Sequence, residues 1–188
     1  MSTQRFAGFV AAGILLCGIA LAAAAQDPVI PRADTVVKPR ALVSVQPAPR
    51  SATVEVAVVA EILKGFHVNS NTPKEDYLIP TTLTAQTPAG LKVLETAYPK
   101  GEMQKFGFSE TPLDVYDGTI TIKMKVQVAA DAPTGATKLP MVLRYQACND
   151  VACLPPVKMP VVADLQIADA GAKSVAQHPN VFGKSKTK

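Results

Sequence analysis

Apolar and polar residues alternate along much of the chain between residues 51 and 169. The clearest run extends from Thr119 to Val128, and every second residue in it is apolar: Ile120, Ile122, Met124, Val126 and Val128. Strict alternation of this kind predicts a β-strand with one buried face and one exposed face. Similar runs cover residues 53–58, 141–146 and 157–165, and shorter apolar runs occur between them. We therefore expect several short strands.

Turn-forming sequences separate these runs. They are Asn71-Thr-Pro, Thr87-Pro-Ala-Gly, Tyr98-Pro-Lys-Gly, Tyr116-Asp-Gly and Asp131-Ala-Pro-Thr-Gly. No segment after the first 25 residues has a helical period. About seven strands in about 115 residues are typical of an all-β, immunoglobulin-like antiparallel β-sandwich. The usual Cys and Trp signature of antibody domains is absent, because the chain has no Trp.

The first 25 residues differ from the rest of the chain. Arg5 precedes a run from Ala7 to Ala25 that is apolar or small throughout and ends in Ala23-Ala-Ala25. This pattern predicts a secretory signal peptide over residues 1–25, cleaved after Ala25. A retained membrane anchor is the alternative, and lipidation of Cys17 is disfavoured by the bulky Leu16 before it. We expect a periplasmic or secreted protein with no stable membrane insertion after cleavage.

The two segments that flank the alternating region, residues 26–50 and 170–188, show no strand pattern. Residues 26–50 contain five prolines and few large apolar residues, which predicts an extended, Pro-rich linker. Residues 170–188 end in a basic sequence and predict a disordered tail. The expected domain is therefore residues 51–169.

Charge and cysteine content narrow the possible functions. The 19 basic and 15 acidic residues are scattered, so no nucleic-acid partner is expected. The chain has 3 Cys, and loss of Cys17 with the signal leaves Cys148 and Cys153 in an oxidising compartment. These two residues therefore become the main candidates for chemistry.

Cys148-Asn-Asp-Val-Ala-Cys153 lies between two predicted strands, so a hairpin would bring the two cysteines within disulfide distance. The residues alone leave open whether such a disulfide is a structural staple or a redox site. A Cu(I) site that also uses His67 or a methionine is a further alternative, although the spacing matches no recognised metal-binding pattern.

The segment Tyr145-Gln-Ala-Cys-Asn-Asp-Val-Ala-Cys-Leu-Pro-Pro156 resembles the N-terminal periplasmic domain of the transmembrane thiol:disulfide interchange protein DsbD. Gly65-Phe-His-Val-Asn-Ser-Asn71 and the region from Tyr98 to Gly118 agree with this resemblance, which covers about residues 50 to 168. The sequence contains no membrane-spanning electron-transfer region and no thioredoxin-like Cys-x-x-Cys motif. We therefore expect a stand-alone domain of this kind.

The resemblance implies a periplasmic thiol-disulfide exchange module, a protein-disulfide reductase-like activity without a cofactor, and a link to cytochrome c maturation. The implied partners are thioredoxin-like periplasmic proteins and a membrane thiol-electron transporter, and we expect a monomer. It implies further that Cys153 bonds the partner and that Cys148 is the resolving thiol. A β-sandwich adaptor with a structural disulfide is the alternative function.

Other residues are candidates for positions around the cysteines. In the family a Phe covers the disulfide, and Phe106 is the first candidate and Phe108 the second. Both could instead fill the end of the sandwich. The resemblance also places His67 and Asn69 beside the pair.

The residues of the cysteine motif itself add two expectations. Asp150 lies in the predicted turn, where its charge would raise the pKa of a nearby thiol. Pro155 and Pro156 lack backbone donors, so the chain after Cys153 is expected to be extended and partly unpaired.

Overall fold

A computed structural model describes residues 30–183 of the chain. These residues form mainly β-strands, with one short 3₁₀ helix and one turn of α-helix. The elements are η1 Ala33–Thr35, β1 Val37–Val43, β2 Val45–Gln46, β3 Ala48–Pro49, β4 Thr53–Ile62, β5 His67–Asn69, β6 Thr82–Ala85, β7 Leu91–Ala97, β8 Glu102–Gln104, β9 Leu113–Tyr116, β10 Thr119–Val128, β11 Gly135–Tyr145, β12 Ala147–Cys148, β13 Val157–Ala168, β14 Val175–Ala176 and α1 Pro179–Phe182. The predicted signal peptide lies outside the described residues.

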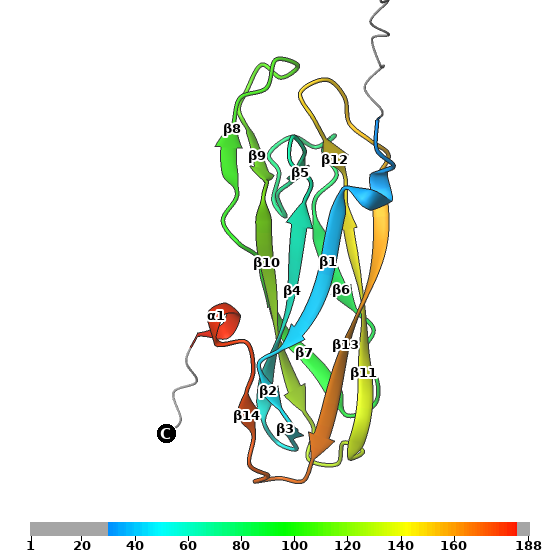
Figure 1. Ribbon diagram of the computed structural model, residues 1–188, viewed down its shortest axis with the longest axis vertical. Coiled ribbons are helices and arrows are strands. Elements are labelled where there is room, and N and C mark those ends of the chain that lie inside the picture. The colour runs from blue at the N-terminus through cyan, green and yellow to red at the C-terminus, as the bar shows by residue number, and fades with distance from the viewer. Residues whose placement is uncertain (1–29, 184–188) are drawn as a thin grey trace, which may run out of the picture. The chain divides into compact units, whose positions relative to one another are not determined.

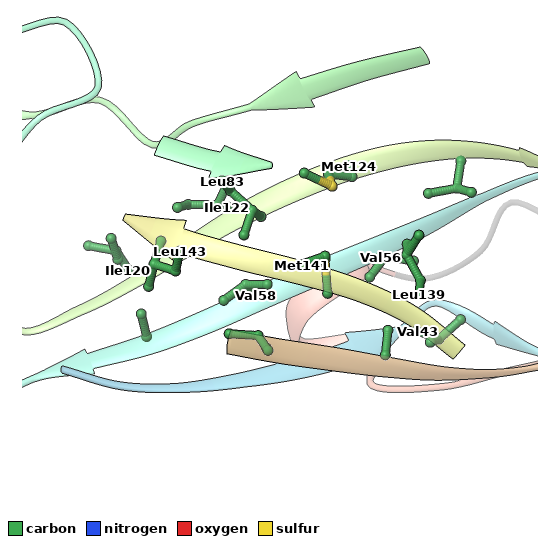
Figure 2. Packing of buried hydrophobic residues seen from close by; sticks show 14 of the residues in the cluster. Val43, Val56, Val58, Leu83, Ile120, Ile122, Met124, Leu139, Met141 and Leu143 are labelled. Atoms are coloured by element: carbon green, nitrogen blue, oxygen red, sulfur yellow. The ribbon is translucent and has the colours of Figure 1, made fainter. Parts of the chain in front are cut away.

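Two four-stranded sheets pack face to face (Figure 1). One has the strand order β1-β4-β10-β7 and the other β3-β13-β11-β6, and only the short β13–β3 pair is parallel. Between the sheets lies a core of aliphatic and Met side chains, to which Ile122 contributes from one sheet and Met141 from the other (Figure 2). The all-β, immunoglobulin-like sandwich predicted from the sequence is confirmed.

The long strands follow the alternating pattern of the sequence. In β10 the apolar residues Ile120, Ile122, Met124, Val126 and Val128 are all buried. The residues between them point to the other side, where Lys125 forms an exposed ion pair with Glu95 of β7. Burial of one face against the second sheet therefore determines the register of this strand.

A smaller sheet of short strands, with the order β12-β5-β9-β8, lies at one end of the sandwich (Figure 1). β5 is central in it, because β12 pairs with one edge of β5 and β9 with the other. A second, minor cluster of buried side chains supports this end and consists of Leu78, Phe106, Leu113 and Val115. This small sheet carries the cysteine segment.

The expectation of an extended linker over residues 26–50 is wrong for the part from residue 33 onward. β1 pairs with β4 over its whole length, from Val37 opposite Ile62 to Val43 opposite Val56. The Tyr145 hydroxyl also donates a hydrogen bond of 2.9 Å to the carbonyl of Ala33. Prolines can occupy β1 because it is an edge strand, and an edge strand needs backbone partners on one side only. The domain therefore begins before residue 51.

The expected disordered tail is likewise ordered over residues 170–183. β14 pairs with β2 in the antiparallel register Val175 opposite Gln46, and α1 follows. The ring of Phe182 lies 5.7 Å from the Lys123 ammonium group. Residues 184–188 lie outside the described part of the chain.

Candidate functional site

A tight hairpin brings the two cysteines together. Cys148 ends β12, and the Asn149 side-chain oxygen accepts hydrogen bonds from the backbone N–H groups of Val151 and Ala152, at 2.9 and 2.8 Å. The Asn149 N–H donates to the Ala152 carbonyl at 3.0 Å, which closes the turn. Asn is suited to this position because its side chain can bond to the backbone two residues further on.

Cys148 and Cys153 face each other across this turn and are joined by a disulfide, with their Cα atoms 4.0 Å apart. Their exposure differs sharply, because Cys148 is only 1% exposed whereas Cys153 is exposed. Val151, at the tip of the turn, is 86% exposed. A thiolate from another molecule can therefore approach Cys153 but not Cys148.

The chain that follows Cys153 is held at one point and then leaves the small sheet. The Leu154 N–H donates to the Ala147 carbonyl at 2.8 Å, and the side chain of Leu154 is buried. Pro155 and Pro156 are exposed and belong to neither β12 nor β13, which begins at Val157. An exposed segment without regular strand pairing thus lies directly beside the accessible cysteine.

His67 lies next to the disulfide in the small sheet. It is the cross-strand partner of Cys148, which in turn is the bridge partner of Cys153. Directly opposed residues of antiparallel strands project to the same face, so the three side chains form one row. His67 is 4% exposed, and its Nε2 has no hydrogen-bond partner among the described residues.

Phe106 covers the histidine end of this row. Its ring stacks on the His67 ring with centroids 4.1 Å apart and an interplanar angle of 22°. Phe108 stacks on the outer side of Phe106 at 5.4 Å and is 49% exposed. Phe106 is buried, so it both covers His67 and fills the minor cluster at this end of the sandwich.

The turn that carries the two Phe residues is held by Lys105. The Lys105 ammonium group donates to the carbonyl of Ser109 at 2.6 Å and also to the carbonyl of Glu110. The Ser109 N–H donates to the Phe106 carbonyl at 3.2 Å. These bonds hold the backbone on both sides of Gly107, and so they position the Phe106 ring.

A cavity of about 420 Å³ opens beside His67 and Phe106. Its polar lining comes from Lys64, Gln104, Asp117 and Asp150. Burial lowers the pKa of His67 below its ordinary value, while the charges of Asp150 and Asp117 act in the opposite direction. The buried imidazole is therefore mainly neutral at pH 7, although two carboxylates lie near it.

Asn69 belongs to β5 like His67, but its side chain and carbonyl form hydrogen bonds with a different part of the chain. The Asn69 side-chain amide donates to the Ile79 carbonyl at 3.0 Å, and its backbone carbonyl accepts from the Thr81 hydroxyl at 2.6 Å. These bonds hold the loop between β5 and β6. The hydrogen bonds of Asn69 therefore go to this loop, not to the cysteine hairpin.

The model of the family described as thiol:disulfide interchange protein DsbD, N-terminal, matches residues 33–163. This match covers more than half of the chain and includes both cysteines, His67 and Phe106. The chain belongs to the DsbD N-terminal domain family.

Two solved structures are similar to this DsbD N-terminal family member. The N-terminal domain of DsbD from Neisseria meningitidis in its reduced form is 21% identical, with a TM-score of 0.40, and the match covers 71% of this chain and 88% of that one. The N-terminal periplasmic domain of ScsB from Proteus mirabilis is 13% identical, with a TM-score of 0.49, and the match covers 79% of this chain and 51% of that one. No curated protein sequence matches the chain significantly.

Several residues around the cysteine pair of this family member are not evident from the sequence. Lys64, Gln104 and Asp117 line the cavity, and Lys105 holds the Phe106 turn. The only sequence signal for Asp117 is a turn motif, Tyr116-Asp-Gly, that gives no hint of a neighbouring cysteine.

Within residues 30–183, no group of three or more His, Cys, Asp or Glu side chains is arranged to hold a metal ion. Over the same residues, no helix has the length and apolar character needed to span a bilayer.

Proposed function

We propose that this protein is a periplasmic thiol-disulfide exchange domain that uses Cys148 and Cys153 to accept and pass on a pair of electrons. The observation that carries this proposal is the unequal exposure of a disulfide in a member of the DsbD N-terminal family. Exchange requires one sulfur that a partner can attack and one that leaves. Cys153 is exposed and Cys148 is buried, so each cysteine suits one of these roles.

The reaction begins when a partner thiolate attacks the sulfur of Cys153. A bond forms between the partner and Cys153, the Cys148–Cys153 bond breaks, and Cys148 leaves with the electron pair as a thiolate. A second partner thiol then attacks the mixed disulfide and frees Cys153. The partner is oxidised to a disulfide and the Cys pair is reduced, and the reverse sequence passes the electrons to the next protein.

We infer that Phe106 acts as a shield in this scheme. It lies over His67 at the end of the cysteine row, and the turn that carries it is held by Lys105. A ring in this place hinders access from the side of β8 and β9, while the turn side of Cys153 stays exposed. The exposed Val151, Pro155 and Pro156 provide apolar contacts for a docking partner on that side.

The partners we propose are a membrane thiol-electron transporter, which supplies electrons, and thioredoxin-like periplasmic proteins, which exchange them. Membership of the family supports partners with thiol chemistry. The predicted signal peptide supports a periplasmic location. No cofactor is needed, because both electrons are carried by the sulfur atoms.

The redox potential of the cysteine pair tests the proposal against the alternative, an adaptor domain whose disulfide is only structural. The full chain with Cys17→Ser is equilibrated in thiol-disulfide buffers of graded potential, and the reduced fraction is measured by alkylation and mass. An exchange site is expected to have a potential above about −300 mV, since structural disulfides usually lie below that value. A lower potential would support the adaptor function and contradict the exchange function.

A further inference from the structure

His67 lies between the buried sulfur of the cysteine pair and a cavity that leads to solvent. It lines the cavity, and it is also the cross-strand partner of Cys148. Cys148 is almost fully buried and is not among the residues that line the cavity. Side chains in directly opposed positions have Cβ atoms about 4.5–5.5 Å apart, so an imidazole can contact the sulfur opposite it. His67 therefore lies both opposite Cys148 and at the wall of the cavity.

The imidazole has an unused hydrogen-bonding atom. Its Nε2 is buried and has no partner among the described residues, whereas buried polar atoms are usually hydrogen-bonded. The ring is held in place by stacking on Phe106. A ring that is oriented and still has a free nitrogen is suited to exchange a proton with a neighbouring group.

The proposed exchange reaction requires a group that accepts a proton from Cys148. When electrons leave the reduced pair, Cys153 first bonds a partner, and Cys148 must then lose its thiol proton before it attacks the Cys153 sulfur. Only the thiolate is nucleophilic, and burial in apolar surroundings disfavours it. Water does not reach Cys148 directly, because the residue is 1% exposed.

We propose that His67 is the general base that removes the proton of Cys148 in this step and the general acid that returns it when the pair is reduced. The proton passes from the sulfur of Cys148 to the imidazole, Cys148 attacks Cys153, and the partner leaves as a thiolate with the electron pair. The imidazolium then releases the proton to water in the cavity. This inference rests on the proposed exchange function.

The charged groups around His67 suit both removal of the proton from Cys148 and its return. Asp117 and Asp150 lie in two different turns that line the cavity, and they stabilise the imidazolium once it forms. Lys64 lines the same cavity and carries the opposite charge, whereas Lys105 on the Phe106 turn is bound to backbone carbonyls. Burial lowers the pKa of His67, so that the ring is neutral before the step and free to accept a proton.

A stopped-flow reaction with the aromatic disulfide DTNB separates the two thiol steps. The full chain with Cys17→Ser is reduced and mixed with DTNB, which releases one coloured thiolate when Cys153 attacks and a second when Cys148 resolves the mixed disulfide. The rate of the first step depends on the DTNB concentration, whereas the rate of the second step does not. At pH 7 we expect His67→Gln to slow the second step by at least about tenfold and to leave the first unchanged.

The pH profile distinguishes proton transfer from structural damage. At alkaline pH the equilibrium favours the Cys148 thiolate without a general base, so the rates of the second step in the two proteins are expected to converge. A second step that is equally fast in both proteins at pH 7, or slowed by the same factor at every pH, would overturn the role of His67. The matched control is His178→Gln, at the other histidine of the chain next to α1, and it is expected to change neither step.

A second variant removes the imidazole altogether. His67→Ala removes a side chain that lines the cavity, and added imidazole is expected to restore the second step at pH 7. If this variant still forms the disulfide and imidazole has no effect, the proposal fails. If the protein with both histidines shows no second, concentration-independent step, the cysteine pair does not exchange, and the proposed function fails together with this inference.

Discussion

Reduction of the disulfide is expected to lower the stability of the domain only slightly. Cys148 and Cys153 close a loop with a sequence separation of 5. The chain-entropy relation gives about 2.2 kcal/mol for such a short loop. Backbone hydrogen bonds from Asn149 to Ala152 and from Leu154 to Ala147 also hold the hairpin, and we expect them to remain after reduction. For a domain of this size, 1 kcal/mol corresponds to about 2–4 °C in Tm, so the Tm is expected to fall by about 4–9 °C.

Thermal unfolding of the full chain with Cys17→Ser, followed by circular dichroism with and without a thiol reductant, measures this shift. The variant in which Cys148 and Cys153 are both replaced by Ser, studied without reductant, is the matched control and should give a similar Tm. A fall of more than about 15 °C, well above the range worked out from loop entropy, would refute the reasoning. It would show that the disulfide holds the small sheet together and would favour a structural role.

Two further predictions concern the roles of individual residues in exchange. Cys148→Ser is expected to accumulate protein-sized mixed disulfides in a secreting host, because Cys153 is exposed and no resolving thiol remains, whereas Cys153→Ser is not. Non-reducing gels show the adducts, and adducts on Cys153→Ser alone would reverse the assignment. Phe106→Ala is expected to speed the reaction of the disulfide with glutathione several-fold, and Phe108→Ala to have a smaller effect because Phe108 is half exposed. Unchanged rates in both variants would mean that the rings only fill the end of the sandwich.

The alternation of apolar and polar residues located the long strands, although β4 and β11 extend well beyond the predicted residues 53–58 and 141–146. β10 covers residues 119–128, as its pattern indicates, and β13 begins at Val157 as expected. Such strands bury one face against a second sheet, so their period of two residues can be recognised from a local stretch of sequence. The cysteine hairpin was equally evident, because its two cysteines are neighbours along the chain.

The N-terminal strand was not evident for a physical reason. β1 contains Pro39 in an edge position, and its partly buried residues do not alternate regularly. Its pairing with β4 decides that it is a strand, and local composition favoured an extended linker instead. Pairing between distant segments is a property of the whole fold, so composition over residues 26–50 gave no sign of it.

The sequence by itself determined the β-sandwich, the cysteine pair and the nature of the residues available for exchange. The tertiary structure alone decided which of these residues lie next to one another. β5 and β12 are far apart in the sequence, and their pairing places His67 opposite Cys148, while Phe106 arrives from the loop between β8 and β9. The difference in exposure between Cys148 and Cys153 has the same origin, because burial depends on what the surrounding strands place over each sulfur.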